Sequence, residues 1–200
     1  MRFVHLSLVC FCVVALTTSL ALAKNKKAEK QTDPQAMMEA YQKLATPSEP
    51  HKQFASLVGS WTTTTKEWME PGKPPTESTG SVEMKMLLDG RFLQQEFSGD
   101  MMGHPYSGIG ISGYDNLRKR YVSTWIDTMG TGIFTMEGTS SPDGKTITLK
   151  GQHAELGGGH MTHRAVWKIV DSNTQTFDMY GAHQGGKETK MMEITYTRRP

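Results

Sequence analysis

From Ser60 to the C-terminus, short β-prone segments alternate with turn-forming clusters, and no helical periodicity interrupts them. Asp89-Gly90 and Asp143-Gly144 are the strongest hairpin signals among the turns. Consecutive strands without intervening helices favour an antiparallel meander, which closes most naturally as a barrel or a sandwich. We therefore predict an all-β antiparallel barrel of about ten strands. The strands are expected at 61–69, 81–88, 91–98, 106–112, 119–127, 132–138, 146–152, 161–170, 175–180 and 187–198.

The stretch from Gly108 to Asp127 is expected to form the central hairpin of this barrel. A glycine-rich strand at 106–112 and a β-branched and aromatic strand at 120–127 are joined by a turn at 113–116. In the second strand one face carries Tyr121, Ser123, Trp125 and Asp127, and the other carries Arg120, Val122, Thr124 and Ile126. Polar groups on an inward face indicate a wet cavity. The alternative is that these groups are only solvated, and the sequence does not say which face points inward.

The N-terminus is typical of a secretory signal. Residues 1–23 combine a positive start with a short apolar run that ends in Ala21-Leu22-Ala23, so we expect cleavage after Ala23 and a periplasmic or extracellular mature protein. Both cysteines, Cys10 and Cys12, lie in this segment. Their loss from the mature chain excludes disulfides, thiolate metal sites and a cysteine nucleophile.

A polar linker is expected at 24–32 and one or two short helices at 33–58, ahead of a barrel domain at 59–200. Asp33-Pro34 is a typical helix start, and Gly59 is the expected end of the second helix. The first helix carries an apolar face that consists of Met37, Met38, Tyr41 and Leu44. We expect this face to cap the barrel; the alternative is an interaction protein that docks the helix on a partner.

The net charge of the chain limits which classes of binding partner are expected. The net charge is +2, and it falls to +1 once Arg2 leaves with the signal, which argues against nucleic acid as the main partner. No later apolar run approaches the roughly 20 residues that a membrane span needs. We expect a monomer or a weak oligomer.

Two features resemble the lipocalin-like (calycin) barrels. Gly59-Ser60-Trp61 follows a short helix and opens the first strand, as the G-x-W signature of those barrels does. Arg198 ends the last strand, where those barrels place an arginine over the tryptophan. The resemblance implies that Gly59, Trp61 and Arg198 close one end of the barrel, which is a structural role.

Four further motifs resemble the uncharacterised bacterial family numbered 1579 among domains of unknown function. They are Leu87-Leu88-Asp89-Gly90-Arg91-Phe92-Leu93, Pro105-Tyr106-Ser107-Gly108-Ile109-Gly110, Gly113-Tyr114-Asp115-Asn116 and Tyr121-Val122-Ser123-Thr124-Trp125-Ile126-Asp127. The resemblance covers about 51–199. It implies a lipocalin-like barrel and no established activity.

Histidines raise two alternatives. His160-Met161-Thr162-His163 suggests a copper site, but its histidines lie an odd number apart and would point to opposite faces of one strand, so no metal site is predicted. Ten-stranded barrels that resemble nitrobindin hold haem through a late-strand histidine. His153, His163 and His183 are late enough for that role, and haem is kept as an alternative cofactor.

We expect a small apolar or amphipathic molecule to bind in the cavity. The alternative is an enzyme that uses a cavity carboxylate such as Glu96, Asp127 or Glu137 as acid or base. The chain has no G-x-S-x-G, P-loop or H-E-x-x-H motif, so no catalytic residue is assigned. The candidate ligand-binding residues are Gln95, Glu96, Phe97, Tyr106, Tyr121, Trp125, Asp127 and Met136.

Overall fold

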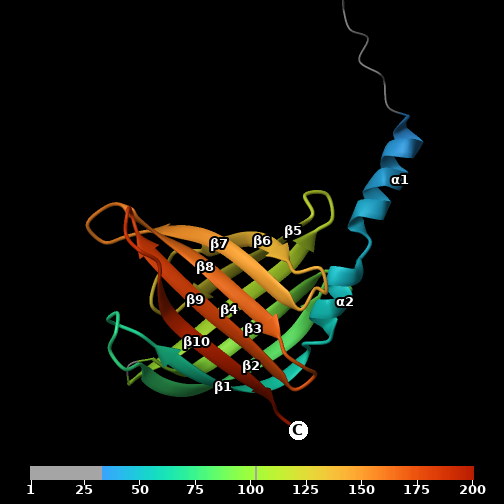
Figure 1. Ribbon diagram of the computed structural model, residues 1–200. Coiled ribbons are helices and arrows are strands. Elements are labelled where there is room, and N and C mark those ends of the chain that lie inside the picture. The colour runs from blue at the N-terminus through green and yellow to red at the C-terminus, as the bar shows by residue number, and fades with distance from the viewer. Residues whose placement is uncertain (1–32, 102) are drawn as a thin grey trace, which may run out of the picture.

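The protein is a single closed barrel of antiparallel strands preceded by two helices (Figure 1). The computed structural model describes residues 33–101 and 103–200; the predicted signal at 1–23 and linker at 24–32 lie outside them. The helices are α1 (Pro34–Ala45) and α2 (Glu49–Ala55). The strands are β1 (Gly59–Glu67), β2 (Thr76–Leu87), β3 (Phe92–Met101), β4 (His104–Asp115), β5 (Arg120–Asp127), β6 (Phe134–Ser140), β7 (Thr146–Ala154), β8 (His160–Ile169), β9 (Thr174–His183) and β10 (Thr189–Arg198). The predicted all-β barrel is confirmed.

The strands pair in chain order, and β1 closes the ring by pairing with β10. The register of that seam places Trp61 opposite Arg198. The Asp89-Gly90 turn forms as predicted, with positive φ at Asp89 (54°) and Gly90 (84°). A meander closed on itself leaves no unpaired sheet edge, which is why ten short strands are stable together.

The predicted turn at 113–116 is misplaced. Strand β4 runs on to Asp115, and the turn begins at Asn116. The side chain of Asn116 forms hydrogen bonds with the end of α1 and with the segment that joins α1 to α2. Its Nδ2 donates to the carbonyls of Leu44 (2.8 Å) and Thr46 (2.9 Å), and its Oδ1 accepts from Ser48 Oγ (2.7 Å). This tertiary role is not visible from the local sequence.

The two helices differ in what they cover. Asp33 caps α1 as expected, with its Oδ1 accepting from the backbone N–H of Gln35 (3.0 Å). However, α1 projects away from the barrel and none of its residues is buried (Figure 1). The expectation that its apolar face caps the barrel is therefore wrong. The cap is α2, which ends at Ala55, earlier than Gly59.

The α2 end of the barrel is closed by a packed plug. Phe54 and Leu57 are each 1% exposed, and Trp61 beneath them is fully buried. The indole N–H of Trp61 donates to the carbonyl of Leu57 (2.9 Å), and the Arg198 guanidinium lies 4.2 Å from the centroid of its ring. A cation over an indole face is favourable by roughly 0.5–2 kcal/mol. Residues at opposite ends of the barrel domain thus close one end together.

The closed half of the interior is apolar and dense. Its buried side chains include Met84, Leu93, Ile147, Leu149 and Ala165. Three polar side chains of the barrel are also fully buried, namely Thr63, Ser112 and Gln175, and the Oε1 of Gln175 accepts from the indole N–H of Trp167 (2.7 Å). No helix in the part of the chain described has the length and apolarity to cross a membrane.

Candidate functional site

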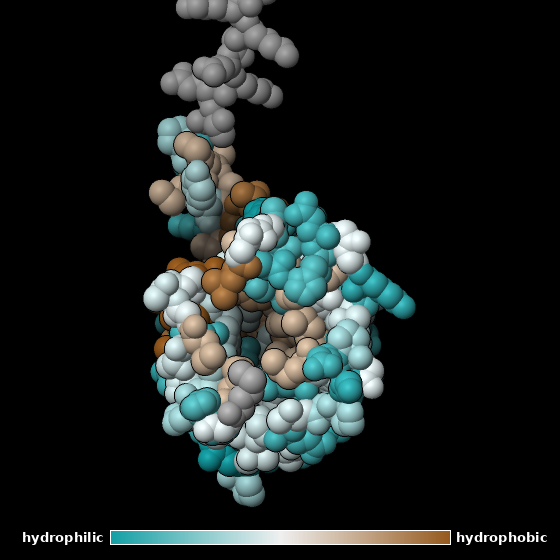
Figure 2. Space-filling model, turned by 90° about the vertical axis from the view of Figure 1, so that its left-hand side faces the viewer, coloured by the Kyte–Doolittle hydropathy of each residue, from teal (hydrophilic) through white to brown (hydrophobic). Residues whose placement is uncertain are grey.

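The open half of the barrel holds a cavity of about 140 Å³, enough for several waters or a small ligand. Figure 2 views the end of the barrel opposite α2 and shows a hollow ringed by more polar side chains. Its aromatic lining is Phe97, Tyr106, Trp125, Phe134, Trp167, Phe177 and Tyr196. Its methionines are Met101, Met136, Met179 and Met192, and its polar side chains are Thr65, Glu67, Ser78, Gln95, Asp100 and Ser123. Apolar walls with few polar groups are typical of ligand pockets.

Glycines on β4 set the position of Trp125. The register places Gly110 opposite Trp125 and Gly108 opposite Asp127. A Cβ added at Gly108 would lie 2.2 Å from Trp125 Cζ2, and one added at Gly110 would lie 3.0 Å from Cε3. Because these glycines have no side chains, the indole lies against the β4 backbone. The glycine-rich strand noted in the sequence therefore leaves room inside the barrel.

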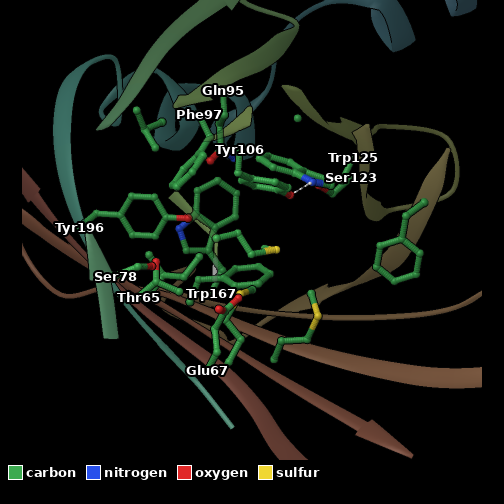
Figure 3. A pocket seen from close by; sticks show the side chains of 18 of the residues that line it. Thr65, Glu67, Ser78, Gln95, Phe97, Tyr106, Ser123, Trp125, Trp167 and Tyr196 are labelled. Atoms are coloured by element: carbon green, nitrogen blue, oxygen red, sulfur yellow. Dashed lines mark hydrogen bonds between the residues drawn. The ribbon is translucent and has the colours of Figure 1, made fainter. Parts of the chain in front are cut away.

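A hydrogen-bonded triplet fixes the polar edge of the cavity, and Figure 3 shows the bond between two of its members, Trp125 and Tyr106. The indole N–H of Trp125 donates to both Tyr106 Oη and Asp127 Oδ2, each at 3.0 Å, and the Tyr106 hydroxyl donates to Asp127 Oδ2 (3.1 Å). Burial raises the pKa of the Tyr106 phenol, and the carboxylates of Asp127 and Glu67 add to the rise, against the opposing effect of the Trp125 hydrogen bond. The phenol therefore stays protonated and acts as a donor.

Glu67 brings a carboxylate into the same cavity. It ends β1 on the inward face that begins with Trp61 and continues through Thr63 and Thr65. Burial raises the pKa of Glu67 above its ordinary value. No hydrogen bond or ion pair within residues 33–101 and 103–200 engages this carboxylate. Sequence reasoning missed Glu67, although counting in twos from Trp61 would have found it.

The structure brings together five of the eight predicted binding residues. Gln95, Phe97, Tyr106, Trp125 and Met136 line the cavity. Asp127 stands behind them and fixes Trp125 and Tyr106. Tyr121 lies deeper, 3% exposed, with its ring 5.7 Å from that of Phe54. Ligand binding by any of these residues stays a prediction.

Glu96 is in the wrong place for a cavity residue. Its neighbours Gln95 and Phe97 point inward, so strand alternation turns Glu96 outward. Its Oε1 lies 2.8 Å from Lys85 Nζ on the outer surface. Glu137 is also turned outward and pairs with Arg118. Neither carboxylate is available for chemistry in the cavity.

The late-strand histidines form a pair beside the cavity, behind Phe134. The rings of His153 and His163 stack with centroids 4.9 Å apart, and His163 Nε2 lies 2.9 Å from His153 Nδ1. His183 lies 2.6 Å from a carboxylate oxygen of Glu155. Among the residues described, no histidine lines the cavity and no three His, Cys, Asp or Glu side chains are grouped as metal ligands. His163 shares the inward face of β8 with Ala165 and Trp167, so haem stays an alternative cofactor.

Comparison with known proteins places the fold. The family model described as "Protein of unknown function (DUF1579)" matches residues 46–198, which is most of the described chain. The chain belongs to this family. The match agrees with the motifs at 87–93, 105–110, 113–116 and 121–127. No curated protein matches the chain.

Solved structures share the barrel of this DUF1579 protein. The crystal structure of Rv2717c from M. tuberculosis is 15% identical, with 78% of this chain and 100% of that chain covered and a TM-score of 0.56. The S-type phycobiliprotein lyase CPES from Guillardia theta is 12% identical, with coverages of 74% and 92% and a TM-score of 0.50. At these identities the likeness concerns the lipocalin-like fold alone.

Proposed function

We propose that this protein binds a small apolar or amphipathic molecule in the open half of its barrel. The observation that carries the proposal is the contrast between the two halves of the interior. Trp61 and Leu93 in the closed half are fully buried, whereas at the other end aromatic rings and methionines surround a cavity of about 140 Å³. A barrel with a purely structural role gains nothing from leaving that surface unfilled.

The binding energy has two sources. An apolar ligand body removes aromatic and methionine surface from water, at about 25 cal/mol per Å². The triplet of Trp125, Tyr106 and Asp127 is already hydrogen-bonded, so the wall is pre-organised before a ligand arrives. Of the carboxylates predicted for catalysis, Asp127 accepts from Trp125, Tyr106 and the backbone N–H of Met129, and Glu96 and Glu137 face outward, so none of the three carries a proposal of catalysis.

Export belongs to the same proposal. The segment 1–23 has the features of a cleaved signal, so the protein would meet its ligand in the periplasm or outside the cell. Sequencing the N-terminus of the protein recovered from a secreting host tests this point. A mature chain that begins at Lys24 is expected, and a chain that retains Met1 in the cytoplasm would contradict export.

Two adjacent glutamines of β3 provide a matched test of binding. Gln95 points into the cavity, whereas Gln94 lies on the outer face, where its Nε2 donates to Glu96. The probe is N-phenyl-1-naphthylamine, a neutral amphipathic dye that fluoresces in apolar surroundings. Filling the cavity with Gln95→Trp should weaken dye binding by about tenfold or more, and Gln94→Trp should leave it unchanged. Equal binding by both variants would refute the cavity as the binding site.

Native mass and absorption spectra of protein from a native-like source identify the natural ligand. A bound mass of a few hundred daltons that is lost in Gln95→Trp would establish a carrier. A Soret band would identify haem as the ligand.

A further inference from the structure

We propose that the ligand is a cation, namely a protonated amine or quaternary ammonium group on an apolar or aromatic body. The inference rests on the proposed binding function and adds the charge of the ligand. It follows from the position of Glu67, from the signs of the charges along the cavity and from its aromatic walls.

The charged side chains of the cavity are all acidic. Glu67 points into it, and Asp127 stands behind its wall, hydrogen-bonded to Trp125 and Tyr106. Asp100 lies at the rim, exposed, and its carboxylate accepts from the backbone N–H of Gly103 (2.7 Å). Among the described lining residues there is no lysine, arginine or histidine. The chain as a whole has a net charge of +2, so this sign is local to the cavity. A low-dielectric wall strengthens the attraction of such charges for a cation.

Basic residues near this end are engaged elsewhere. Lys66, next to Glu67 in sequence, points to the outer face and lies 3.8 Å from Glu77. Lys190 lies 2.9 Å from Asp178, also pairs with Glu193, and sits 5.5 Å from the ring centroid of Trp68. Neither ammonium pairs with the Glu67 carboxylate. The negative charge inside the barrel is therefore left for something else to balance.

The environment of the Glu67 carboxylate indicates that it lacks a positively charged partner. A partly buried carboxylate without a hydrogen-bond or ionic partner loses hydration and gains nothing in return. The raised pKa of Glu67 has burial as its cause, which is the expected sign of this imbalance. A cation in the cavity would restore a partner. An anion such as a fatty-acid carboxylate would place a second negative charge beside it.

The aromatic lining favours the same class of ligand. Seven rings surround the cavity, and the faces of Trp, Tyr and Phe carry a negative quadrupole that attracts cations. Trp125 and Trp167, the strongest cation-binding ring type, lie on its wall together with Tyr106 (Figure 3). Recognition of quaternary ammonium groups by aromatic side chains with a nearby carboxylate needs only residues that are present here.

A pair of isosteric probes isolates the charge. Phenyltrimethylammonium and tert-butylbenzene have nearly the same shape, and they differ by one positive charge. Each is titrated as a competitor of N-phenyl-1-naphthylamine, with benzenesulfonate as the anionic counterpart. We expect the cation to bind about tenfold more tightly than the neutral isostere. Benzenesulfonate should be the weakest of the three.

Glu67→Gln removes the charge and keeps the shape, so the preference for the cation should fall to near parity. The matched control is Glu77→Gln, which neutralises a carboxylate on the outer face at the same end of the barrel and should keep the preference. A thermal melt of each variant reports folding. If Glu67→Gln does not fold, the salt dependence of the wild-type preference decides, since added salt should reduce it for a partly exposed charge.

The outcomes separate this inference from the function on which it rests. Dye and tert-butylbenzene binding without preference for the cation would overturn the cationic ligand and leave the binding cavity standing. A preference unchanged in Glu67→Gln would overturn the role of Glu67 and with it the inference. Binding of none of the probes, the dye included, would overturn both.

Discussion

Replacing Arg198 with methionine should open the closed end of the barrel. The guanidinium donates from Nη1 to the carbonyl of Val58 (2.6 Å), from Nη2 to that of Ser56 (2.8 Å) and from Nε to that of Ser172 (2.7 Å). It also lies over the ring of Trp61. A methionine keeps an apolar stem against the indole and removes all three hydrogen bonds and the cation.

The expected loss is about 4 kcal/mol. A hydrogen bond from a charged donor contributes about 1.5–3 kcal/mol. We take about 1 kcal/mol for each of the three bonds, because Arg198 is partly exposed and water can bind the carbonyl groups that it leaves. The cation over the ring adds about 0.5–1 kcal/mol at such a site. This is a large share of the 5–15 kcal/mol that stabilises a typical domain.

Urea unfolding followed by tryptophan fluorescence measures the effect. With a slope of about 2 kcal/mol per M, the midpoint should fall by about 2 M. The matched control is Arg199→Met, which removes an exposed pair with Glu83 (2.5 Å) and should cost at most about 1 kcal/mol. A midpoint shift in Arg198→Met no larger than in the control would refute the closure argument.

Three further predictions follow from the interior. Gly108→Ala places a methyl group where Trp125 Cζ2 would be 2.2 Å away, so it should displace the ring, weaken dye binding by about tenfold and cost about 1–3 kcal/mol of stability in urea. Asp127→Asn keeps one oxygen as the acceptor for Trp125 and Tyr106, removes the charge and loses the bond from the backbone N–H of Met129 (2.9 Å), so it should weaken binding of the cationic probe several-fold and cost about 1 kcal/mol in a thermal melt. Burial and the neighbouring His153 lower the pKa of His163 below its ordinary 6.5. Below about pH 6.5 the unfolded chain therefore binds more protons than the folded chain, and the free energy of unfolding should fall as the pH is lowered. The melting temperature followed against pH should show this decline in the wild type and a smaller decline in His163→Gln.

A specific result would contradict each of these three predictions. Unchanged tryptophan fluorescence and dye affinity in Gly108→Ala would mean that Trp125 does not rest on β4. Unfolding of Asp127→Asn would make this carboxylate a structural partner. An identical pH profile in wild type and His163→Gln would assign the acid sensitivity to other groups, of which His51, with a pKa also lowered by burial, is the first to examine.

Several features of the fold were predictable because their causes are local. The Asp89-Gly90 turn requires positive φ, which glycine and aspartate tolerate, and the ten strands follow from β-prone runs between such turns. The cap at Asp33 depends on a side chain two residues from its partner. Even the odd spacing of His160 and His163 correctly separated them onto two faces, since His163 is buried and His160 is exposed.

Other features depend on contacts that no local pattern encodes. Strand alternation states that Glu96 lies opposite to Gln95, but it does not state which of the two is inside. In β3 both faces carry polar and aromatic residues, so only the closed barrel decides which face points inward. The misplaced turn at Asn116 has the same origin, because its side chain bonds to a segment about 70 residues away.

The sequence by itself determined an all-β meander, the Asp89-Gly90 turn, the cap at Asp33 and membership of a family, because these depend on periodicity and on neighbours in the chain. Only the tertiary structure decided that α2 closes one end, that the other end keeps a cavity, and that Glu67 lies within it. The physical reason is ring closure: pairing β1 with β10 sets the phase of every strand at once, and that phase converts alternating residues into an inside and an outside.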